Sequence, residues 1–311
     1  MDSNIKIEAL IDNIERVLIG KRECVKLVIV GLIARGHVLI EDVPGVGKTT
    51  LARALAKSID CSFQRIQFTP DLLPGDIIGI SIFQQLSGQL LFKPGPIFAS
   101  VILADEINRA TPRTQSSLLE AMNDFQVSVD GTTHNLPNPF IVLATQNPTE
   151  FEGTYPLPES QLDRFLMRVK IGYPDLEQEM KILSSHSSSS PLDNLTPVLD
   201  AEDILGLQKA AEKVHIDKSL MEYILKIAAK TRESKYLELG ISPRGCLNLF
   251  RASKALALVQ KRKFCIPDDI KKLTLPVLLH RLITKNGRNL DVMQDAHEIL
   301  LDILEELPIP E

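Results

Sequence analysis

The pattern of hydrophobic and polar positions changes its period near residue 36. Over residues 5–35, apolar residues such as Leu10 and Ile14 recur at helical spacing, which predicts helices. The run His37–Ile40 is short, largely apolar and followed by a glycine-rich turn. Such a run is typical of a strand that is buried on both faces of a parallel sheet. Beyond the turn, Leu51 and Leu55 begin a series with a four-residue spacing, which predicts another helix.

The alternation of strands and helices continues to about residue 171. Four further apolar runs predict strands: Ser62–Phe68, Ser100–Ala104, Phe140–Thr145 and, more weakly, Leu166–Ile171. Strands that alternate with helices favour an α/β fold, so we expect a P-loop domain with a five-stranded, mostly parallel sheet.

Two stretches interrupt this alternation. Residues Ile80–Pro96 contain apolar runs on both sides of Ser87-Gly88, which predicts a small hairpin inserted within a helical region. Residues Gln126–Phe140 contain Asp130-Gly131, a strong signal for a hairpin turn.

The chain changes character after Tyr173-Pro174, because only helical periodicity follows. Asp175 with Gln178 three residues later begins a helix with a capping box, and Ser242-Pro243 begins another with an N-cap and an N1 proline. We therefore expect an α/β nucleotide-binding domain over residues 1–174, a linker over 175–198 and a smaller all-α lid domain over 199–311.

Composition and charge narrow the functional classes. The 311 residues carry 35 basic and 40 acidic side chains, and this acidic balance predicts no nucleic-acid partner. The four cysteines are scattered without metal-ligand spacing, which indicates reduced thiols of a cytoplasmic protein. The charged N-terminus has no signal-peptide core, and the apolar stretch Leu27–Ala34 is far shorter than the ~20 residues that span a bilayer.

The loop after the first predicted strand has the form of a phosphate-binding P-loop. It reads Asp42-Val43-Pro44-Gly45-Val46-Gly47-Lys48-Thr49. Glycines let successive backbone N–H groups turn towards phosphates, and the helix N-terminus adds its positive dipole end. Lys48 is placed to reach the β- and γ-phosphates of ATP, and Thr49 to offer its hydroxyl to Mg²⁺. The alternative is an ordinary glycine-rich turn, against which the sequence GxGKT in this context argues.

The first residue of this loop departs from the strict P-loop pattern. That pattern begins with glycine, and this chain has Asp42 instead. Because aspartate tolerates the left-handed region better than most residues, we expect the turn to form with Asp42 in the place of the glycine.

Polar residues follow two of the buried strands. Asp105 is suited to the magnesium shell, and Glu106 is placed to polarise the attacking water. The alternative is that these two acids only stabilise the N-terminus of the following helix through its dipole. After the next strand, the amide of Asn147 is placed to orient the water; the alternative is a turn-forming Asn-Pro pair.

Two arginines are candidates for the countercharge that phosphoryl transfer requires. Arg164 directly follows Asp163. Its alternative role is an ion pair with Asp163 or Glu159 at the surface. Arg244 lies in the first turn of a predicted helix, where the helix dipole does not favour a cation. Arg109 and Arg113, just after the acidic pair, are weaker candidates.

Taken together, these residues closely resemble the MoxR family of AAA+ ATPases, over nearly the whole chain from Ile19-Gly20 to Arg244 and beyond. The segments that carry the resemblance are Glu41–Thr49, Asp71–Asp76, Gly95–Phe98, Ala104–Ala110, Leu118–Met122, Ala144–Pro148, Gly153–Glu159 and Leu162–Phe165. Many matched segments in order make the resemblance specific, and Asp42 fits the family's own variant of the loop.

The resemblance implies roles for individual residues. It implies Asn147 as sensor 1, Arg164 as an arginine finger that acts on a neighbouring subunit, and Arg244 as sensor 2 on the lid. It also implies that Asp105 and Thr49 hold the metal. The nucleotide-binding residues that it implies are Ile19 and Gly20 near the adenine, Pro44, Gly45, Val46, Gly47, Lys48, Thr49 and Thr50 in Walker A, and Asp105 in Walker B.

The resemblance also implies an assembly and a class of partner. Such proteins form homo-hexameric rings and mature or remodel protein clients, among them proteins with von Willebrand factor A domains. The two inserted hairpins would be the helix-2 insert and the pre-sensor hairpin. We expect Arg244 to sense the γ-phosphate and to close the lid.

Two other functions remain open at this point. A DNA-remodelling AAA+ translocase subunit is one, although the acidic balance and the absence of Lys and Arg from Gln126–Asn138 argue against it. A nucleotide-gated binding switch with little turnover is the other, against which Glu106, Asn147 and Arg164 argue together.

Overall fold

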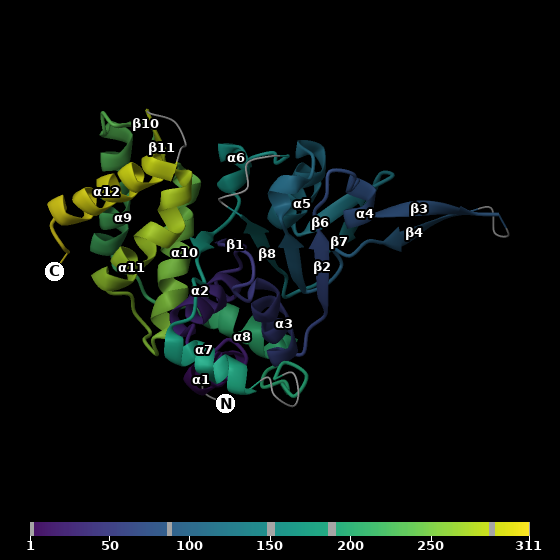
Figure 1. Cartoon of the computed structure of the whole chain (residues 1–311). Coiled ribbons are helices and arrows are strands. Elements are labelled where there is room, and N and C mark those ends of the chain that lie inside the picture. Colours follow the sequence, from purple (N-terminus) through teal and green to yellow (C-terminus); the bar gives the residue numbers. More distant parts are fainter. Residues whose placement is uncertain (1–2, 86–88, 148–152, 186–190, 286–289, 311) are drawn as a thin grey trace.

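Five parallel strands form the centre of the structure, a computed structural model that describes residues 3–85, 89–147, 153–185, 191–285 and 290–310 (Figure 1). The strands are β1 (Val38–Glu41), β2 (Phe63–Gln67), β5 (Val101–Asp105), β8 (Ile141–Gln146) and β9 (Met167–Val169). Their order across the sheet is β2–β5–β8–β1–β9, and every pairing is parallel. Each strand lies within its predicted run or is shifted by one residue, so the predicted sheet is confirmed.

Both faces of the sheet are covered by helices. Alternate residues of the three central strands point to opposite sides, as the two-residue period of a strand requires. Helices α1 (Ser3–Glu15), α2 (Arg22–Ile33) and α3 (Lys48–Ser58) share one hydrophobic cluster with Val38, Ile40, Leu103 and Leu143. On the other face, α5 (Pro112–Asp124) shares a second cluster with Leu39, Ile102 and Val142. This burial explains why the strands are continuously apolar in sequence.

Two antiparallel hairpins interrupt the α/β order, as predicted. The first, β3 (Gly79–Gln84) with β4 (Gln89–Pro94), follows the short helix α4 (Pro74–Ile78) and projects far from the sheet in Figure 1. The predicted turn at Ser87-Gly88 lies outside the described residues. The second pairs β6 (Gln126–Val129) with β7 (Thr132–Asn135), and its turn places Asp130 and Gly131 at positive φ, as a type I′ turn requires.

The chain after residue 174 is mostly helical. Its helices are α7 (Leu176–Ser185), α8 (Ala201–Glu212), α9 (Lys218–Glu233), α10 (Pro243–Val259), α11 (Pro267–Leu278) and α12 (Leu290–Glu306). One expectation was wrong, because two short strands, β10 (Leu237–Leu239) and β11 (Ile283–Thr284), form an antiparallel pair within this region. Strands of two or three residues are too short to show a period in sequence.

The helical region packs directly on the first two helices of the chain. One hydrophobic cluster extends from α1 and α2 through α8, α10 and α11, and Gln208 of α8 donates a 2.9 Å hydrogen bond to the carbonyl of Leu32 in α2. The lid therefore shares its core with the α/β part. The domain boundaries given from sequence stay a prediction.

All four cysteines are free, and three of them are buried. Burial raises the pKa of Cys24 and of Cys265 to about 12, so both are inert thiols at neutral pH. Within the described ranges, none of the helices is long and apolar enough to cross a membrane.

Candidate nucleotide site

The P-loop joins β1 to α3 at the C-terminal edge of the sheet. Gly45 and Gly47 have φ of 85° and 98°, a region that glycine adopts without strain, and Gly47 is the N-cap of α3. The first helical turn contains Lys48, Thr49 and Thr50, so its free N–H groups face the loop. The local geometry is that of a phosphate cradle at a helix N-terminus.

Asp42 does not use the left-handed region that aspartate tolerates, because its φ is not positive. Its side chain is instead a buried anchor. One carboxylate oxygen accepts hydrogen bonds of 2.7 Å from the backbone N–H groups of both Ile171 and Gly172, and the other accepts one of 2.9 Å from Val43. Asp42 therefore ties the start of the P-loop to the segment after β9, a role that glycine could not fill.

The ammonium group of Lys48 lies in the mouth of the loop. It donates a hydrogen bond to the backbone carbonyl of Asp42. Burial lowers the pKa of Lys48, while the carboxylates of Asp42, Asp105 and Glu106 oppose that shift. The cation thus lies near Asp42 and near the acids at the end of β5.

Asp105 is the last residue of β5, and Glu106 follows it directly. The Thr145 hydroxyl donates a 2.6 Å hydrogen bond to Asp105 and accepts one of 2.9 Å from the backbone N–H of Glu106. Glu106 has a φ of 56°, in the left-handed region that non-glycine residues seldom occupy. Backbone conformations of this kind cluster at functional sites. Thr145, at the end of β8, holds the acidic pair in place.

Two side chains of β2 contact these acids, and neither was predicted from the sequence. The guanidinium of Arg65 lies 2.6 Å and 3.0 Å from one oxygen of Asp105. The amide of Gln67 donates a 2.8 Å hydrogen bond to Glu106 Oε2, which also lies 3.2 Å from Nε of Arg109. The available signal in the sequence was that Arg65 and Gln67 are polar residues near the end of a predicted strand, as Asp105 is.

Asn147 lies directly after β8 and is buried. The strand end before it is fastened to β1, because the amide of Gln146 donates a 2.7 Å hydrogen bond to Glu41 and Glu41 forms a buried ion pair with Arg168 of β9. The carboxyl ends of β5, β8 and β1 therefore present Glu106, Asn147 and the P-loop along one edge, where parallel α/β sheets bind ligands.

Oxygen ligands suited to Mg²⁺ occur at this edge. The Thr49 hydroxyl and the Asp105 carboxylate are hard oxygen donors. No group of three or more His, Cys, Asp or Glu side chains that could hold a metal occurs in the described part of the chain. Mg²⁺ is commonly bound through one or two protein oxygens, while it keeps several waters and shares the oxygens of phosphates.

The turn at Ile19-Gly20 lies beside the P-loop. A Cβ at position Gly47 would lie only 3.0 Å from Cδ1 of Leu18, so the two residues are in close contact. Gly20 has a φ of 72°, and the side chain of Gln178 in α7 packs onto it. A contact of Ile19 and Gly20 with the adenine stays a prediction.

Arg164 and Arg244 lie together, at the opposite edge of the sheet from the P-loop. They line one cleft of about 240 Å³ with His37, Asn123 and other residues. His37 precedes β1, and its carbonyl accepts a 2.8 Å hydrogen bond from Leu166, which precedes β9. The cleft therefore lies at the amino ends of these strands. Arg244 donates to the side chain of Asn123 there. Arg113 is exposed at the start of α5.

A parallel sheet in this strand order, with a P-loop and an acidic strand end at one edge and a helical lid, defines the class of AAA-type P-loop ATPases. Residues 37–167 match the family described as "ATPase family associated with various cellular activities (AAA)", and residues 229–302 match the AAA lid domain. The chain belongs to the MoxR family within that class and is an ATPase.

Three relatives show the extent of the similarity. A protein of Bacillus subtilis named Uncharacterized protein YeaC is 48% identical over 96% of this chain and 93% of its own length. Chaperone MoxR1 of Mycobacterium tuberculosis is 41% identical over 89% of this chain and 75% of its own. The crystal structure of a candidate ATPase from Cytophaga hutchinsonii is 38% identical and covers 99% of this chain and 96% of its own, with a TM-score of 0.88.

Proposed function

We propose that this chain hydrolyses ATP with Mg²⁺ in a ring of identical subunits and uses the reaction for chaperone-like remodelling or maturation of partner proteins. The main support is the separation of the catalytic groups. Lys48 and Glu106 lie at the carboxyl edge of the sheet, whereas Arg164 and Arg244 line a cleft at its amino edge. From His37 to Asp42 a strand rises by roughly 16 Å, which is more than an arginine side chain can span.

One chain therefore supplies two incomplete halves of a site. In our proposal Lys48 binds the β- and γ-phosphates, Glu106 polarises the attacking water and Asn147 orients it. Thr49 and Asp105 would hold Mg²⁺, which when bound neutralises charge on the phosphate oxygens. The arginine cleft of the next subunit then completes the site.

This arrangement changes the role that we expect for Arg244. Arg244 lies beside Arg164. We therefore propose that both arginines act on the nucleotide of a neighbouring subunit, and that Arg244 does not act on the nucleotide of its own subunit. Contacts between two different surfaces of identical subunits close into a ring when the rotation permits. An arginine finger is worth ~10³–10⁵ in rate, so an isolated subunit should hydrolyse ATP slowly. The resemblance to the MoxR family supports six subunits.

The test is complementation between two inactive variants. Lys48→Ala removes the phosphate-binding cation but leaves the arginine cleft, and Arg164→Ala does the reverse. Each variant alone should lack ATPase activity. In an equimolar random mixture, roughly a quarter of the interfaces would join an intact P-loop to an intact cleft, so activity should return to about that fraction of wild type.

The control carries both substitutions in one chain. A mixture of Arg164→Ala with the double variant Lys48→Ala, Arg164→Ala should stay inactive, because no intact cleft is present. If the two single variants also fail to complement each other while they form mixed rings, Arg164 acts within its own chain and the proposal is wrong.

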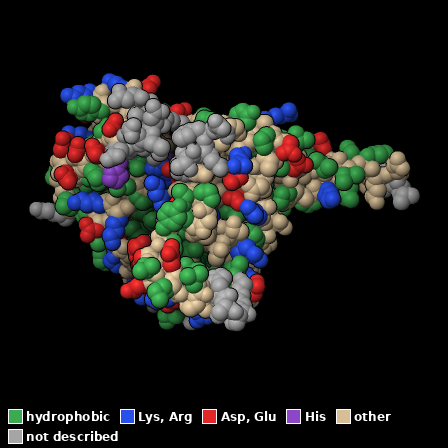
Figure 2. Space-filling view, viewed as in Figure 1, with side chains coloured by type: hydrophobic (Ala, Val, Ile, Leu, Met, Phe, Trp, Pro, Cys, Tyr) green, Lys and Arg blue, Asp and Glu red, His purple; other side chains and the backbone are tan. Residues whose placement is uncertain are grey.

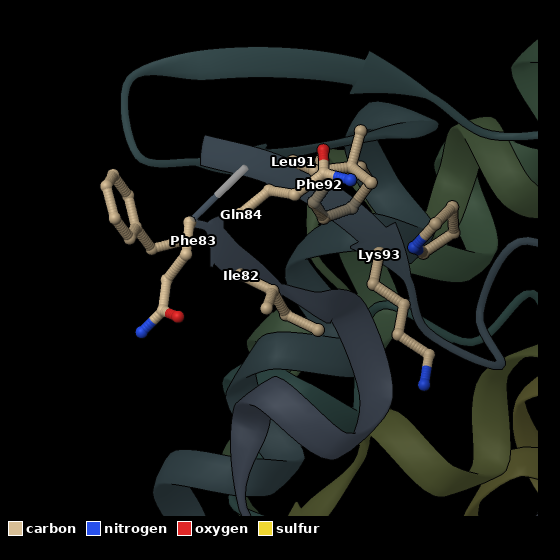
Figure 3. A pocket seen from close by; sticks show the side chains of 8 residues that line it. Ile82, Phe83, Gln84, Leu91, Phe92 and Lys93 are labelled. Atoms are coloured by element: carbon tan, nitrogen blue, oxygen red, sulfur yellow. The ribbon is translucent and has the colours of Figure 1, made fainter. Parts of the chain in front are cut away.

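The projecting hairpin supports the choice of proteins as clients. Ile82, Phe83, Leu90 and Leu91 are 46–65% exposed, and hydrophobic side chains are visible along the arm in Figure 2. Figure 3 shows that side chains of both strands line an open pocket of about 590 Å³. Contiguous exposed apolar surface marks a site of protein interaction. We propose that this surface contacts clients, including the von Willebrand factor A domain proteins that the resemblance implies.

Client contact can be tested with a trapped ring. Glu106→Gln should bind ATP without hydrolysis and retain a client in a pull-down. Adding Phe83→Ser and Leu90→Ser should release the client while the ring stays assembled. Deletion of residues 80–91 should abolish remodelling, and normal remodelling by that variant would overturn the role of the hairpin.

A further inference from the structure

Arg281 occupies an unusual place for a charged side chain. It ends the short helix η2 (Leu279–Arg281) of the lid, and its side chain is only 2% exposed. Burial lowers its pKa to about 10, with the Asp163 carboxylate opposing the shift, so the guanidinium is charged at neutral pH. A buried charge is costly unless it is paired and fully hydrogen-bonded. Its partners therefore indicate what it is there to hold.

Two of those partners, the Val277 carbonyl and the ring of His280, belong to the lid itself, and the others belong to the segment that contains Arg164. Nε of Arg281 lies 2.8 Å from the carboxylate of Asp163, the residue directly before Arg164. The two Nη groups donate to the backbone carbonyls of Asp163, Phe165 and Leu166. One lid side chain thus fixes the backbone on both sides of Arg164.

The same carboxylate also contacts the helix that carries Arg244. The Ser242 hydroxyl lies 3.3 Å and 3.4 Å from the two oxygens of Asp163 and accepts a hydrogen bond from Gly245 as the N-cap of α10. Gly245 packs closely here, since a Cβ at this position would lie 2.8 Å from Ile241 Cγ2 and 3.2 Å from Arg281 Cδ. Asp163 therefore joins Arg281, the segment of Arg164 and the start of α10 in one unit.

We infer that Arg281 is a positioning residue: through Asp163 it holds Arg164 and Arg244 in one fixed arrangement. This inference rests on the proposed action of Arg164 on a neighbouring subunit. Arg281 touches no nucleotide itself. Its guanidinium fork can satisfy the carboxylate and the carbonyls together, which a lysine ammonium cannot.

The test places Arg281→Lys in either partner of the complementing pair. In the Lys48→Ala chain, which supplies the arginines, it should lower the recovered kcat at least about tenfold, because a displacement of 1 Å in a catalytic group costs on the order of 10²-fold. In the Arg164→Ala chain, which supplies the P-loop, it should leave the recovered kcat within about twofold of the unmodified pair. A purely structural role would lower activity equally in both placements.

A matched control is Arg262→Lys, since Arg262 forms a similar ion pair with Asp269 elsewhere in the lid, and it should change neither placement. If Arg281→Lys does not fold, Asp163→Asn should give the same asymmetry from the other side of the pair. Equal loss in both placements, or no loss in either, would overturn the inference. Failure of the unmodified pair to complement would instead overturn the proposed function.

Discussion

The side-chain amide of Gln67 lies 2.8 Å from Oε2 of Glu106, so the carboxylate that we assign to water activation is held from the neighbouring strand. Arg109 lies against the same oxygen. An oxygen that already accepts hydrogen bonds is a weaker acceptor for the proton of a water molecule. Glu106 must exchange these partners for water before it can act as a base.

Gln67→Ala should therefore raise the basal ATPase rate of the assembled protein. A hydrogen bond of about 1 kcal/mol that is lost before the transition state corresponds to a rate increase of about fivefold. Steady-state phosphate release measures this. Gln64→Ala, an exposed position on the same strand, is the control and should have no effect. A lower rate for Gln67→Ala would mean that the amide helps to place Glu106 for catalysis.

Asp42→Gly restores the strict P-loop pattern yet should destabilise the protein. It leaves the N–H groups of Ile171 and Gly172 without their carboxylate partner, which costs about 3 kcal/mol. Urea unfolding measures the loss. Asp130→Gly is the matched control, because Asp130 has a φ of 49° and glycine relieves strain there. Equal stability of the two variants would contradict the anchoring role of Asp42.

Arg65→Ala should lower the Mg²⁺ concentration that gives half-maximal ATPase activity. The guanidinium competes with the cation for Asp105, but its side chain is 49% exposed, so the pair is worth only about 0.2–1 kcal/mol. We therefore expect a decrease of about 1.4-fold to fivefold, measured by magnesium titration at saturating ATP. Arg53→Ala, at an exposed position in α3, should leave the magnesium requirement unchanged. An increased requirement would show that Arg65 assists the site.

The folded protein should lose stability as the pH falls from about 6.5 towards 4. Burial lowers the pKa of His37 to about 4, and the neutral ring accepts a 3.0 Å hydrogen bond from Val142 and contacts the carbonyl of Met122. The unfolded chain binds a proton more readily across this window. The stabilisation is thus present above pH 6.5 and decreases by on the order of 3 kcal/mol down to pH 4.

Urea unfolding at a series of pH values between 5 and 7.5 tests this expectation. The His37→Phe variant should be less stable than wild type at neutral pH. Its free energy of unfolding should also decrease less steeply towards pH 5. Burial also lowers the pKa of His280 well below 6.5, so His280 should maintain part of the dependence of unfolding free energy on pH in that variant. An unchanged slope in His37→Phe would contradict the assignment.

Much of the site could be predicted because its signals are local. Gly45, Gly47, Lys48 and Thr49 are consecutive or nearly so. One short apolar run precedes this loop, and another precedes Asp105. The partners across strands could not be predicted in this way. Arg65 and Asp105 are separated by 40 residues and meet only because β2 lies beside β5 in the folded sheet.

The same limit applies to the two arginines. Each was recognisable in its own segment, but only the folded chain shows that Arg164 and Arg244 share a cleft far from the P-loop. The contact between Asp163 and Arg281, 118 residues apart, had no sequence signal at all. Hydrophobic periodicity reports which face of an element is buried and says nothing of which element covers it.

By itself, the sequence determined the α/β class, the five strands, the two hairpins and the phosphate loop, because each follows from local periodicity, turn chemistry or a short motif. The tertiary structure alone decided that Asp42 is a buried anchor, that side chains of β2 contact both acids, and that Arg164 and Arg244 line a cleft at the opposite edge of the sheet from the P-loop. These facts depend on strand order and on how the lid packs on α1 and α2. Both are set by contacts between residues that are distant in the chain.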